Sequence, residues 1–575
     1  MRNSSASRLA AGARRRSPIR WRSSRCGRAV AAVAALAIAV IGLSLAASGA
    51  TARASSAIQP LRACGDLVGD YGIPGAATHV TAATVVPAAN GQPEYCDVQG
   101  YVEPAVHFQL KLPTTTFNGR YVQYGCAGLC GTIFPTTFPA CGGTPGGDFA
   151  VAATDDGHVG KGGGFLAILD GSWAANDQAA RDDYFYRAPH VVSLASKRII
   201  AAYYGSPPAR SYFDGCSTGG REGLLLAQRY PHDFNGIVAG APAAFMGPLN
   251  GVYFTWMVRV NTDARGAPIL ASAKLPALHD AVMAACDRLD GLADGQIDDP
   301  QGCTFDPASI QCPAGVDDAS CLTPAQVDVV QKVYSGPADA SGHRLYPGGA
   351  PRGSELSWDG FLVPNPQFGS IAPLPDNYLK YLGYPIGAPA SSVADFKFTL
   401  GEFNRLTPES LKGNALSLDL RNFQRAGGKL IIWQGWADGN ISVFGTLDYY
   451  QRLWQANGGL AETQQWARLF MVPTLYHCGL GGYKLNTFDP FPELVDWVEH
   501  RHAPDWVIAS DQDSHGTVLR TRPVYPYPQR AAYTGAGSID DARNFAPAAP
   551  LVPPHDVIRW AGAYLYSIPG PVAPS

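Results

Sequence analysis

The chain of 575 residues lacks internal repeats, and after residue 54 it also lacks any cluster of basic residues. Its formal net charge is −3, and setting aside the ten arginines of the first 54 residues leaves −13. An acidic chain without a basic patch is a poor candidate for binding nucleic acid, so we exclude that class of partner. The chain is also too long for one compact core, which indicates at least two domains.

The first 54 residues contain no acidic side chain. Arginines precede an apolar run over residues 29–47, and small residues follow it at positions 50–54. This order is typical of a cleaved export signal. We therefore predict that residues 1–54 are a signal peptide and that the mature protein is secreted or periplasmic, without membrane attachment. The alternative is an uncleaved anchor, because the apolar run approaches the length that spans a bilayer.

The chain has twelve cysteines, of which Cys26 lies in the predicted signal peptide. In an exported protein, the remaining eleven predict disulfide bonds. Because eleven is an odd number, at least one thiol stays free or pairs outside the chain.

Two regions alternate short apolar strands with helices. The expected strands are 120–124, 211–213, 236–240, 429–433 and 469–472, and the clearest helix is 222–230. The segment between the regions is rich in Asp, Gly, Pro and Cys and has weak strand signals. We predict an α/β fold in which residues 55–246 and 422–575 form one sheet with helices on both faces. Residues 247–421 would be an inserted lid domain over the carboxyl ends of the strands, where ligands bind.

The most informative motif is Gly215-Cys216-Ser217-Thr218-Gly219-Gly220, between an expected strand and an expected helix. In this context Gly-x-Ser-x-Gly is the nucleophile-elbow pattern, in which a sharp turn exposes a serine hydroxyl. Ser217 is therefore the candidate nucleophile, and the alternative is a surface serine in a glycine-rich turn. For the oxyanion hole we expect the N–H of Thr218 and one N–H of the glycine-bearing loop 125–131, which we assign to Gly128.

A candidate base and a candidate acid follow the last two expected strands. His477 lies beyond strand 469–472, and Asp438 lies just past strand 429–433. The resulting order of Ser, Asp and His along the chain is that of the α/β-hydrolase fold. The alternative for Asp438 is a turn residue that caps the next helix, and a lone histidine is usually structural. The neighbouring cysteines favour the triad, because it would bring Cys216 and Cys478 close enough to bridge.

A second constellation lies in the predicted lid. Asp287, Asp290 and Asp294 are spaced by three and four residues, with glycines that permit tight turns. Such carboxylates suit a hard cation with oxygen ligands, and we expect Ca²⁺ rather than Zn²⁺, which prefers His and Cys. Cys286 and Cys303 flank the run and would close it into a ring. The alternative is an exposed acidic turn.

From about Cys64 to Phe545 the chain resembles the tannase and feruloyl esterase family of α/β-hydrolases. The resemblance rests on the pairing of Cys-Ser with His-Cys and on the motifs at 215–221, 153–158, 435–438, 477–479 and 525–529. It implies the triad Ser217, Asp438 and His477, and a structural Ca²⁺ in the lid. The ligands that it implies for this ion are the side chains of Asp287, Asp290 and Asp294 and the carbonyls of Leu292 and Gln296. It also implies the disulfides Cys216–Cys478, Cys64–Cys96, Cys286–Cys303 and Cys312–Cys321.

The chain departs from the family pattern in two places. Tyr525 and Ala546 stand where the family usually has cysteines, and both changes together fit the clean loss of one disulfide. The oxyanion loop carries Cys126 and Cys130, with Cys141 nearby, and two of these three are candidates to pair.

We therefore expect an exported serine esterase that acts through an acyl-enzyme. The resemblance implies small aromatic ester substrates, such as feruloyl, galloyl or similar phenolic esters, free or attached to a plant polymer. The alternatives are a non-catalytic binding module on a hydrolase scaffold and a peptidase of the same fold. The sequence makes no prediction of oligomeric state.

Overall fold

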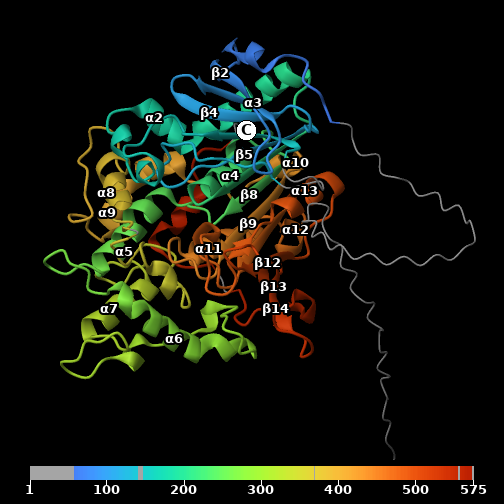
Figure 1. The fold of residues 1–575 in the computed structure, drawn as a ribbon. Helices are drawn as coiled ribbons and strands as arrows, with labels where there is room; N and C mark the ends of the chain where they lie inside the picture. The colour runs from blue at the N-terminus through green and yellow to red at the C-terminus, as the bar shows by residue number, and fades with distance from the viewer. Residues whose placement is uncertain (1–56, 140–146, 368, 555–556, 573–575) are drawn as a thin grey trace, which may run out of the picture.

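The computed structural model describes residues 57–139, 147–367, 369–554 and 557–572. The predicted signal peptide, residues 1–54, and Cys141 lie outside the described residues. The largest element is a ten-stranded sheet with the order β1-β2-β3-β4-β6-β5-β7-β8-β9-β10 (Figure 1). Its strands are β1 Gly69–Tyr71, β2 Thr78–Val86, β3 Tyr95–Val102, β4 Val106–Pro113, β5 Arg120–Tyr124, β6 Phe149–Thr154, β7 Arg210–Cys216, β8 Gly236–Gly240, β9 Lys429–Gly435 and β10 Ala467–Val472.

The sheet is mixed. Strands β6, β5, β7, β8, β9 and β10 pair in parallel, whereas β1 to β4 form an antiparallel extension that joins the parallel part at β6. Every strand that we predicted lies in the parallel part, and the bounds of β5 and β8 agree with the prediction. The carboxyl ends of β7, β9 and β10 therefore share one edge of the sheet, where ligands bind in open α/β folds.

Helices cover both faces of the parallel strands. Along β9, Leu430 and Ile432 face a core that includes α3 Ala188–Tyr204, α4 Thr218–Arg229 and α11 Val443–Ala456. The alternate residues Ile431 and Trp433 face a second core under α13 Phe491–His500. Because successive side chains of a strand point to opposite faces, the unbroken apolar run 430–433 of β9 is buried on both. The predicted α/β sheet with helices on both faces is confirmed.

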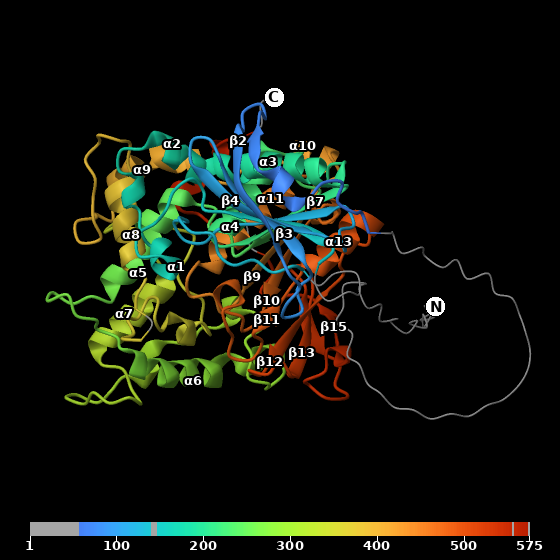
Figure 2. The same ribbon diagram turned by 45° about the horizontal axis from the view of Figure 1, so that its top comes forward.

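The chain between β8 and β9 contributes helices and no strand to the ten-stranded sheet. These helices are α5 Phe254–Val260, α6 Leu275–Cys286, α7 Pro324–Ser335, α8 Pro373–Asn377, α9 Leu400–Gly413 and α10 Arg421–Arg425. In both views α5, α6 and α7 lie together beside the sheet (Figures 1 and 2). The lid boundaries at 247 and 421 remain a prediction. Phe254 and Trp358, two aromatic side chains of this segment, are buried in the core.

The C-terminal part adds two small antiparallel sheets that we did not predict. One contains β11 Thr487–Phe488, β12 Val507–Gln512 and β13 Val518–Val524, and the other contains β14 Arg530–Tyr533 and β15 Phe545–Ala548. Tyr525, one of the two positions at which the family resemblance implies a cysteine, packs here with Ala531 and Phe545 in a small apolar cluster. Among the described residues, no helix has the length and apolar character needed to cross a membrane.

Candidate active site

Ser217 lies at a sharp turn between β7 and α4. Its backbone has φ 64° and ψ −118°, a conformation that is costly for any residue with a side chain. Its N–H donates to the carbonyl of Gly240 at 2.9 Å, and its carbonyl accepts from the N–H of Ala243 at 3.0 Å. A Cβ atom on Gly215 would lie 2.5 Å from the carbonyl oxygen of Gly219, so only glycine lets α4 start this close to β7. The helix begins at Thr218, four residues before the predicted start, because Gly219 and Gly220 belong to its first turn.

Asp438 and His477 meet beyond the ends of β9 and β10. The Nδ1 atom of His477 lies 2.8 Å from Oδ2 of Asp438, whose side chain is completely buried. The other carboxylate oxygen, Oδ1, accepts the N–H groups of Asn440 at 2.8 Å and Ile441 at 3.0 Å. Gln434 donates to Oδ2 from its side chain at 3.2 Å. These bonds orient the carboxylate toward Nδ1 of the imidazole, which leaves Nε2 free to accept a proton.

A disulfide joins the serine and histidine segments. Cys216 precedes Ser217 and Cys478 follows His477, and the two cysteines are bonded with their Cα atoms 5.7 Å apart. The structure thus brings Ser217, Asp438 and His477 to one edge of the sheet. The disulfide links the segments of Ser217 and His477, and the hydrogen bond links His477 to Asp438.

The amides of loop 125–131 identify the candidate oxyanion donors. Five of its seven N–H groups have an acceptor, namely those of Gly125, Cys126, Leu129, Cys130 and Gly131. Within the described part of the chain we find no acceptor for the N–H groups of Ala127, Gly128 or Thr218. The hydroxyl of Thr218 donates to the carbonyl of Gly128 at 2.6 Å, which ties the loop to the start of α4. The choice of Thr218 and Gly128 is therefore compatible with the structure, and Ala127 is a second option in the loop.

Sequence reasoning missed two buried carboxyl groups beneath this loop, Asp156 and Glu222. Oε2 of Glu222 accepts the N–H of Cys126 at 3.2 Å. Burial raises the pKa of both carboxyls, and for Asp156 the neighbouring negative charge of Glu222 raises the pKa further. Asp156 lies in the motif 153–158, and Glu222 directly follows the motif 215–221. Their position beside two family motifs is the signal that was available.

The structure describes five disulfides. Four are the pairs that the family resemblance implies: Cys64–Cys96, Cys216–Cys478, Cys286–Cys303 and Cys312–Cys321. The fifth joins Cys126 to Cys130 in the oxyanion loop. Ten of the eleven cysteines after the predicted signal are thereby paired, and the eleventh is Cys141.

The predicted calcium loop folds around Asp287, whose Oδ1 accepts the N–H groups of residues 294, 295 and 296 at 3.0–3.3 Å. The carboxylate of Asp294 is bonded to Arg522 at 2.5 Å and to the Gln296 amide at 2.7 Å. Oε1 of Gln296 is buried and has no hydrogen-bond partner among the described residues. The three predicted aspartates do not form a set with all ligand oxygens within 4.8 Å of one another.

A serine on a strained strand-to-helix turn and a buried Asp–His pair, all at the carboxyl edge of a mostly parallel sheet, define the α/β-hydrolase class. Within this class, the chain belongs to the tannase and feruloyl esterase family, whose profile matches residues 89–371 and 395–548. It is accordingly a carboxylic ester hydrolase.

Individual relatives agree with this assignment. A mono(2-hydroxyethyl) terephthalate hydrolase of Piscinibacter sakaiensis is 34% identical over 84% of this chain and 90% of that protein. A probable feruloyl esterase B-2 of Aspergillus flavus is 31% identical over 72% of this chain and 80% of its own length. The crystal structure of feruloyl esterase B from Aspergillus oryzae superposes with a TM-score of 0.70 at 26% identity, covering 83% of this chain and 98% of that one.

Proposed function

We propose that the protein is an exported serine esterase that cleaves small aromatic esters through an acyl-enzyme, with Ser217, His477 and Asp438 as its triad. The observation that carries this proposal is the joint restraint of His477 by two bonds. The hydrogen bond to Asp438 sets its tautomer, and the Cys216–Cys478 disulfide ties its loop to the residue before Ser217.

The chemistry follows from these positions. Nε2 of His477 takes the hydroxyl proton of Ser217 as Oγ attacks the ester carbonyl, and the carbonyl oxygen becomes negatively charged. The N–H groups of Thr218 and Gly128 stabilise this oxyanion. The tetrahedral intermediate collapses, the bond to the alcohol oxygen breaks, and His477 returns the proton to that oxygen. Water, deprotonated by His477, then attacks the acyl-serine, which releases the acid and restores Ser217.

The aromatic substrate class is supported by relatives named for feruloyl esters and for a terephthalate mono-ester. The test is hydrolysis of methyl ferulate, methyl gallate, a terephthalate mono-ester, ferulate bound to a plant polysaccharide, acetate esters and short peptides. We expect the aromatic esters to have the highest kcat/KM. Preference for the peptides would favour a peptidase. No labelling of Ser217 by a fluorophosphonate would favour a binding module, and Ser217→Ala is the control for both assays.

Export is supported by the sequence of residues 1–54 and by the five disulfides, which persist in oxidising compartments. Expression of the full chain followed by mass determination of the released protein tests this part of the proposal. A protein that retains residues 1–54 would contradict it.

We also propose a structural Ca²⁺ in the lid, held by the side chains of Asp287, Asp290 and Asp294 and the carbonyls of Leu292 and Gln296. The fold of the loop around Asp287 supports the proposal, as does the buried Oε1 of Gln296 without a partner. Asp290 and Asp294 lie close enough for their charges to interact, and a cation would offset that repulsion. When bound, the ion would brace the lid and take no part in the hydrolytic steps.

A further inference from the structure

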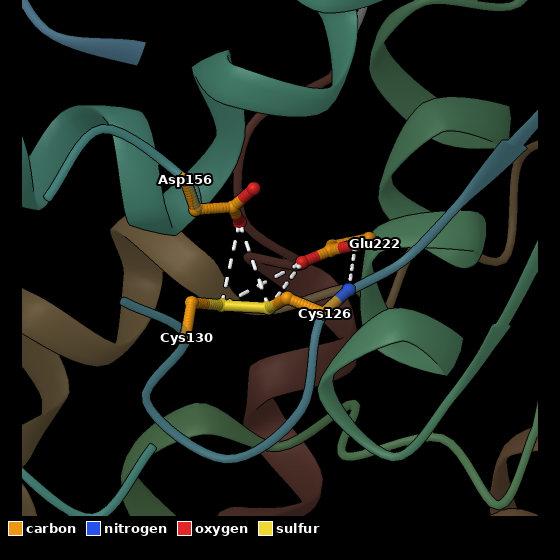
Figure 3. Close-up of side chains that lie close together, drawn as sticks. All are labelled: Cys126, Cys130, Asp156 and Glu222. Carbon is orange, nitrogen blue, oxygen red and sulfur yellow. Dashed lines mark hydrogen bonds between the residues drawn. A yellow bond between two sulfur atoms is a disulfide. The ribbon is translucent and has the colours of Figure 1, made fainter. Parts of the chain in front are cut away.

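Four side chains converge beneath the oxyanion loop, and the esterase mechanism uses none of them. They are Cys126 and Cys130 from the loop, Asp156 from the turn after β6, and Glu222 from α4 (Figure 3). All four are buried. Among the described residues this is the only set of three or more His, Cys, Asp or Glu side chains whose potential metal-ligand atoms all lie within 4.8 Å of one another.

Such a group would suit a metal ion if the sulfurs were thiolates. The two sulfurs are bonded to each other instead. Neither is therefore a thiolate that would bind a metal ion, and neither is a thiol with a proton to donate. Contacts such as the 2.9 Å between Sγ of Cys126 and Oε1 of Glu222 are therefore packing contacts. The two carboxyls still have to be compensated, because two adjacent buried carboxylates repel each other strongly.

The nearest cation does not provide this compensation by direct contact. Arg221 precedes Glu222, and its guanidinium donates to the backbone carbonyls of Phe185, Tyr184 and Gly413. A carboxylate oxygen of Asp156 and one of Glu222 lie within 4.8 Å of each other, both side chains are buried, and Oδ1 of Asp156 has no hydrogen-bond partner among the described residues. Burial and the neighbouring charge of Glu222 raise the pKa of Asp156, so one of these two carboxyls carries a proton.

We propose that Asp156 and Glu222 share one proton and act together as positioning residues for the oxyanion loop. The proton resides on Asp156 and faces the Glu222 carboxylate, whose Oε2 accepts the N–H of Cys126 at 3.2 Å. This inference rests on the proposed function, because it assigns a role to the loop only if the loop binds an oxyanion.

The geometry explains how the pair acts on the reaction. Glu222 lies on α4, the helix that begins with the other oxyanion donor, Thr218. Two further bonds tie the loop to the same helix, from Thr218 Oγ1 to the Gly128 carbonyl at 2.6 Å and from the Gly219 N–H to the Cys126 carbonyl at 3.0 Å. One helix, α4, therefore fixes the positions of both candidate donors, Thr218 and Gly128. The bond to Glu222 fixes the orientation of the Cys126 amide in the same loop.

Loss of the shared proton would leave two negative charges against a rigid disulfide. The other charged or titratable groups that face the pair are Asp155, Arg221, His158 and Tyr184. Burial lowers the pKa of His158 to about 4 and raises that of Tyr184 to about 12, so His158 is neutral at alkaline pH and cannot compensate the second charge. We therefore expect the loop to shift and kcat to fall as the pH rises into the range where Asp156 ionises.

The test compares Asp156→Asn, which keeps a hydrogen-bond donor, with Asp156→Ala, which removes the donor, and Glu222→Ala, which removes the acceptor. In Asp156→Asn we expect kcat within about threefold of the wild type at neutral pH and no alkaline fall in kcat. In both alanine variants we expect kcat to drop by about a hundredfold, with KM changed by less than about threefold, because a displaced oxyanion donor costs about that much. Circular dichroism and the melting temperature verify that each variant is folded.

Any of three results would overturn the inference while the wild type remains an esterase. The first is a kcat of Asp156→Asn as low as that of Asp156→Ala. The second is an alkaline fall in kcat that persists in Asp156→Asn, and the third is a wild-type kcat in the folded alanine variants. A transition-metal ion bound one to one by the wild type and lost in Cys126→Ser would also overturn it. A wild type that hydrolyses no ester is a different outcome, since that would refute the proposed function itself.

Discussion

Cys216 and Cys478 are separated by 262 positions in the chain, and they form a disulfide in which each cysteine is the immediate neighbour of a candidate triad residue. In the chain-entropy model, closing so long a loop contributes about 5 kcal/mol to the free energy of unfolding, as an upper value. The more direct consequence is positional, because the loop of His477 cannot move away from the elbow without moving β7.

We predict that the double substitution Cys216→Ala/Cys478→Ala lowers kcat by about a hundredfold, since a shift of about 1 Å in a triad member costs roughly that factor. Steady-state kinetics on an aromatic ester gives the value, and circular dichroism establishes that the variant is folded. The matched control is Cys312→Ala/Cys321→Ala, which removes a disulfide of the segment between β8 and β9. A folded active-site variant with wild-type kcat would show that the disulfide does not brace the triad.

Asp438→Asn tests the acid of the triad. The amide retains the shape of the carboxylate and an acceptor for the N–H groups of Asn440 and Ile441, but it presents N–H to Nδ1 of His477 and favours the wrong tautomer. We expect kcat to fall by about 10³- to 10⁴-fold with little change in KM. Asp448→Asn is the control, because Asp448 is equally buried and bonds Arg452 of the same helix and Tyr566, neither of which is a candidate triad residue. It should lower the melting temperature and leave kcat nearly unchanged.

The parts of the fold that the sequence predicted are those with a local signal. Strands β8 and β9 contain short apolar runs bounded by glycine or by polar residues, and their burial on both faces leaves a continuous pattern. The antiparallel extension and the C-terminal sheets mix apolar with polar positions. Val106–Pro113, for example, alternates buried and partly exposed residues beside His107 and Lys111, and nothing nearby indicates its partner strand.

In the candidate site, too, the residues that could be predicted are those with a local signal in the sequence. Ser217, Asp438 and His477 were predictable because each follows a recognisable strand, and the cysteines coupled two of them. Asp156 and Glu222 were not, because their significance lies in a contact between side chains 66 positions apart. Pairing within Cys126, Cys130 and Cys141 was likewise left open, since spacing alone allows more than one bond.

The calcium proposal predicts that chelation destabilises the protein. Any ion that binds only the folded chain raises the free energy of unfolding, by about 2.7 kcal/mol at a hundredfold excess over Kd. We expect EDTA to lower the melting temperature by a few degrees, and Ca²⁺ in excess of the chelator to restore it. Asp290→Asn should lose this response, whereas Asp328→Asn, which changes an exposed residue of α7 paired with Lys332, should keep it. A melting temperature insensitive to EDTA, with no calcium in the purified protein, would contradict the proposal.

Asp183 predicts a pH dependence of stability. Burial raises its pKa to about 6, although its ion pair with Arg187 acts in the opposite direction. Because the folded protein holds this proton more tightly than the unfolded chain, the stabilisation is complete below about pH 4 and is lost as the pH rises to about 6. We expect the free energy of unfolding of Asp183→Asn to lose this decline, which is of order 2 kcal/mol. Urea unfolding at intervals between pH 4 and 7 measures it, and an unchanged slope in the variant would refute the assignment.

The substitution Gly215→Ala tests whether the close packing of α4 on β7 positions Ser217. A Cβ atom at this position would meet the backbone of Gly219, with the carbonyl oxygen at 2.5 Å and the carbonyl carbon at 2.6 Å. Backbone atoms cannot rotate away, so Gly215→Ala has to displace the start of α4, and with it Thr218 and the hydroxyl of Ser217. We expect this variant to lose at least about 99% of kcat/KM and a few kcal/mol of stability. Gly65→Ala is the matched control, because a Cβ there meets nothing within 4 Å, and it should behave as the wild type. If Gly215→Ala is folded and fully active, the elbow tolerates the added atom and the close packing of α4 on β7 is not what positions Ser217.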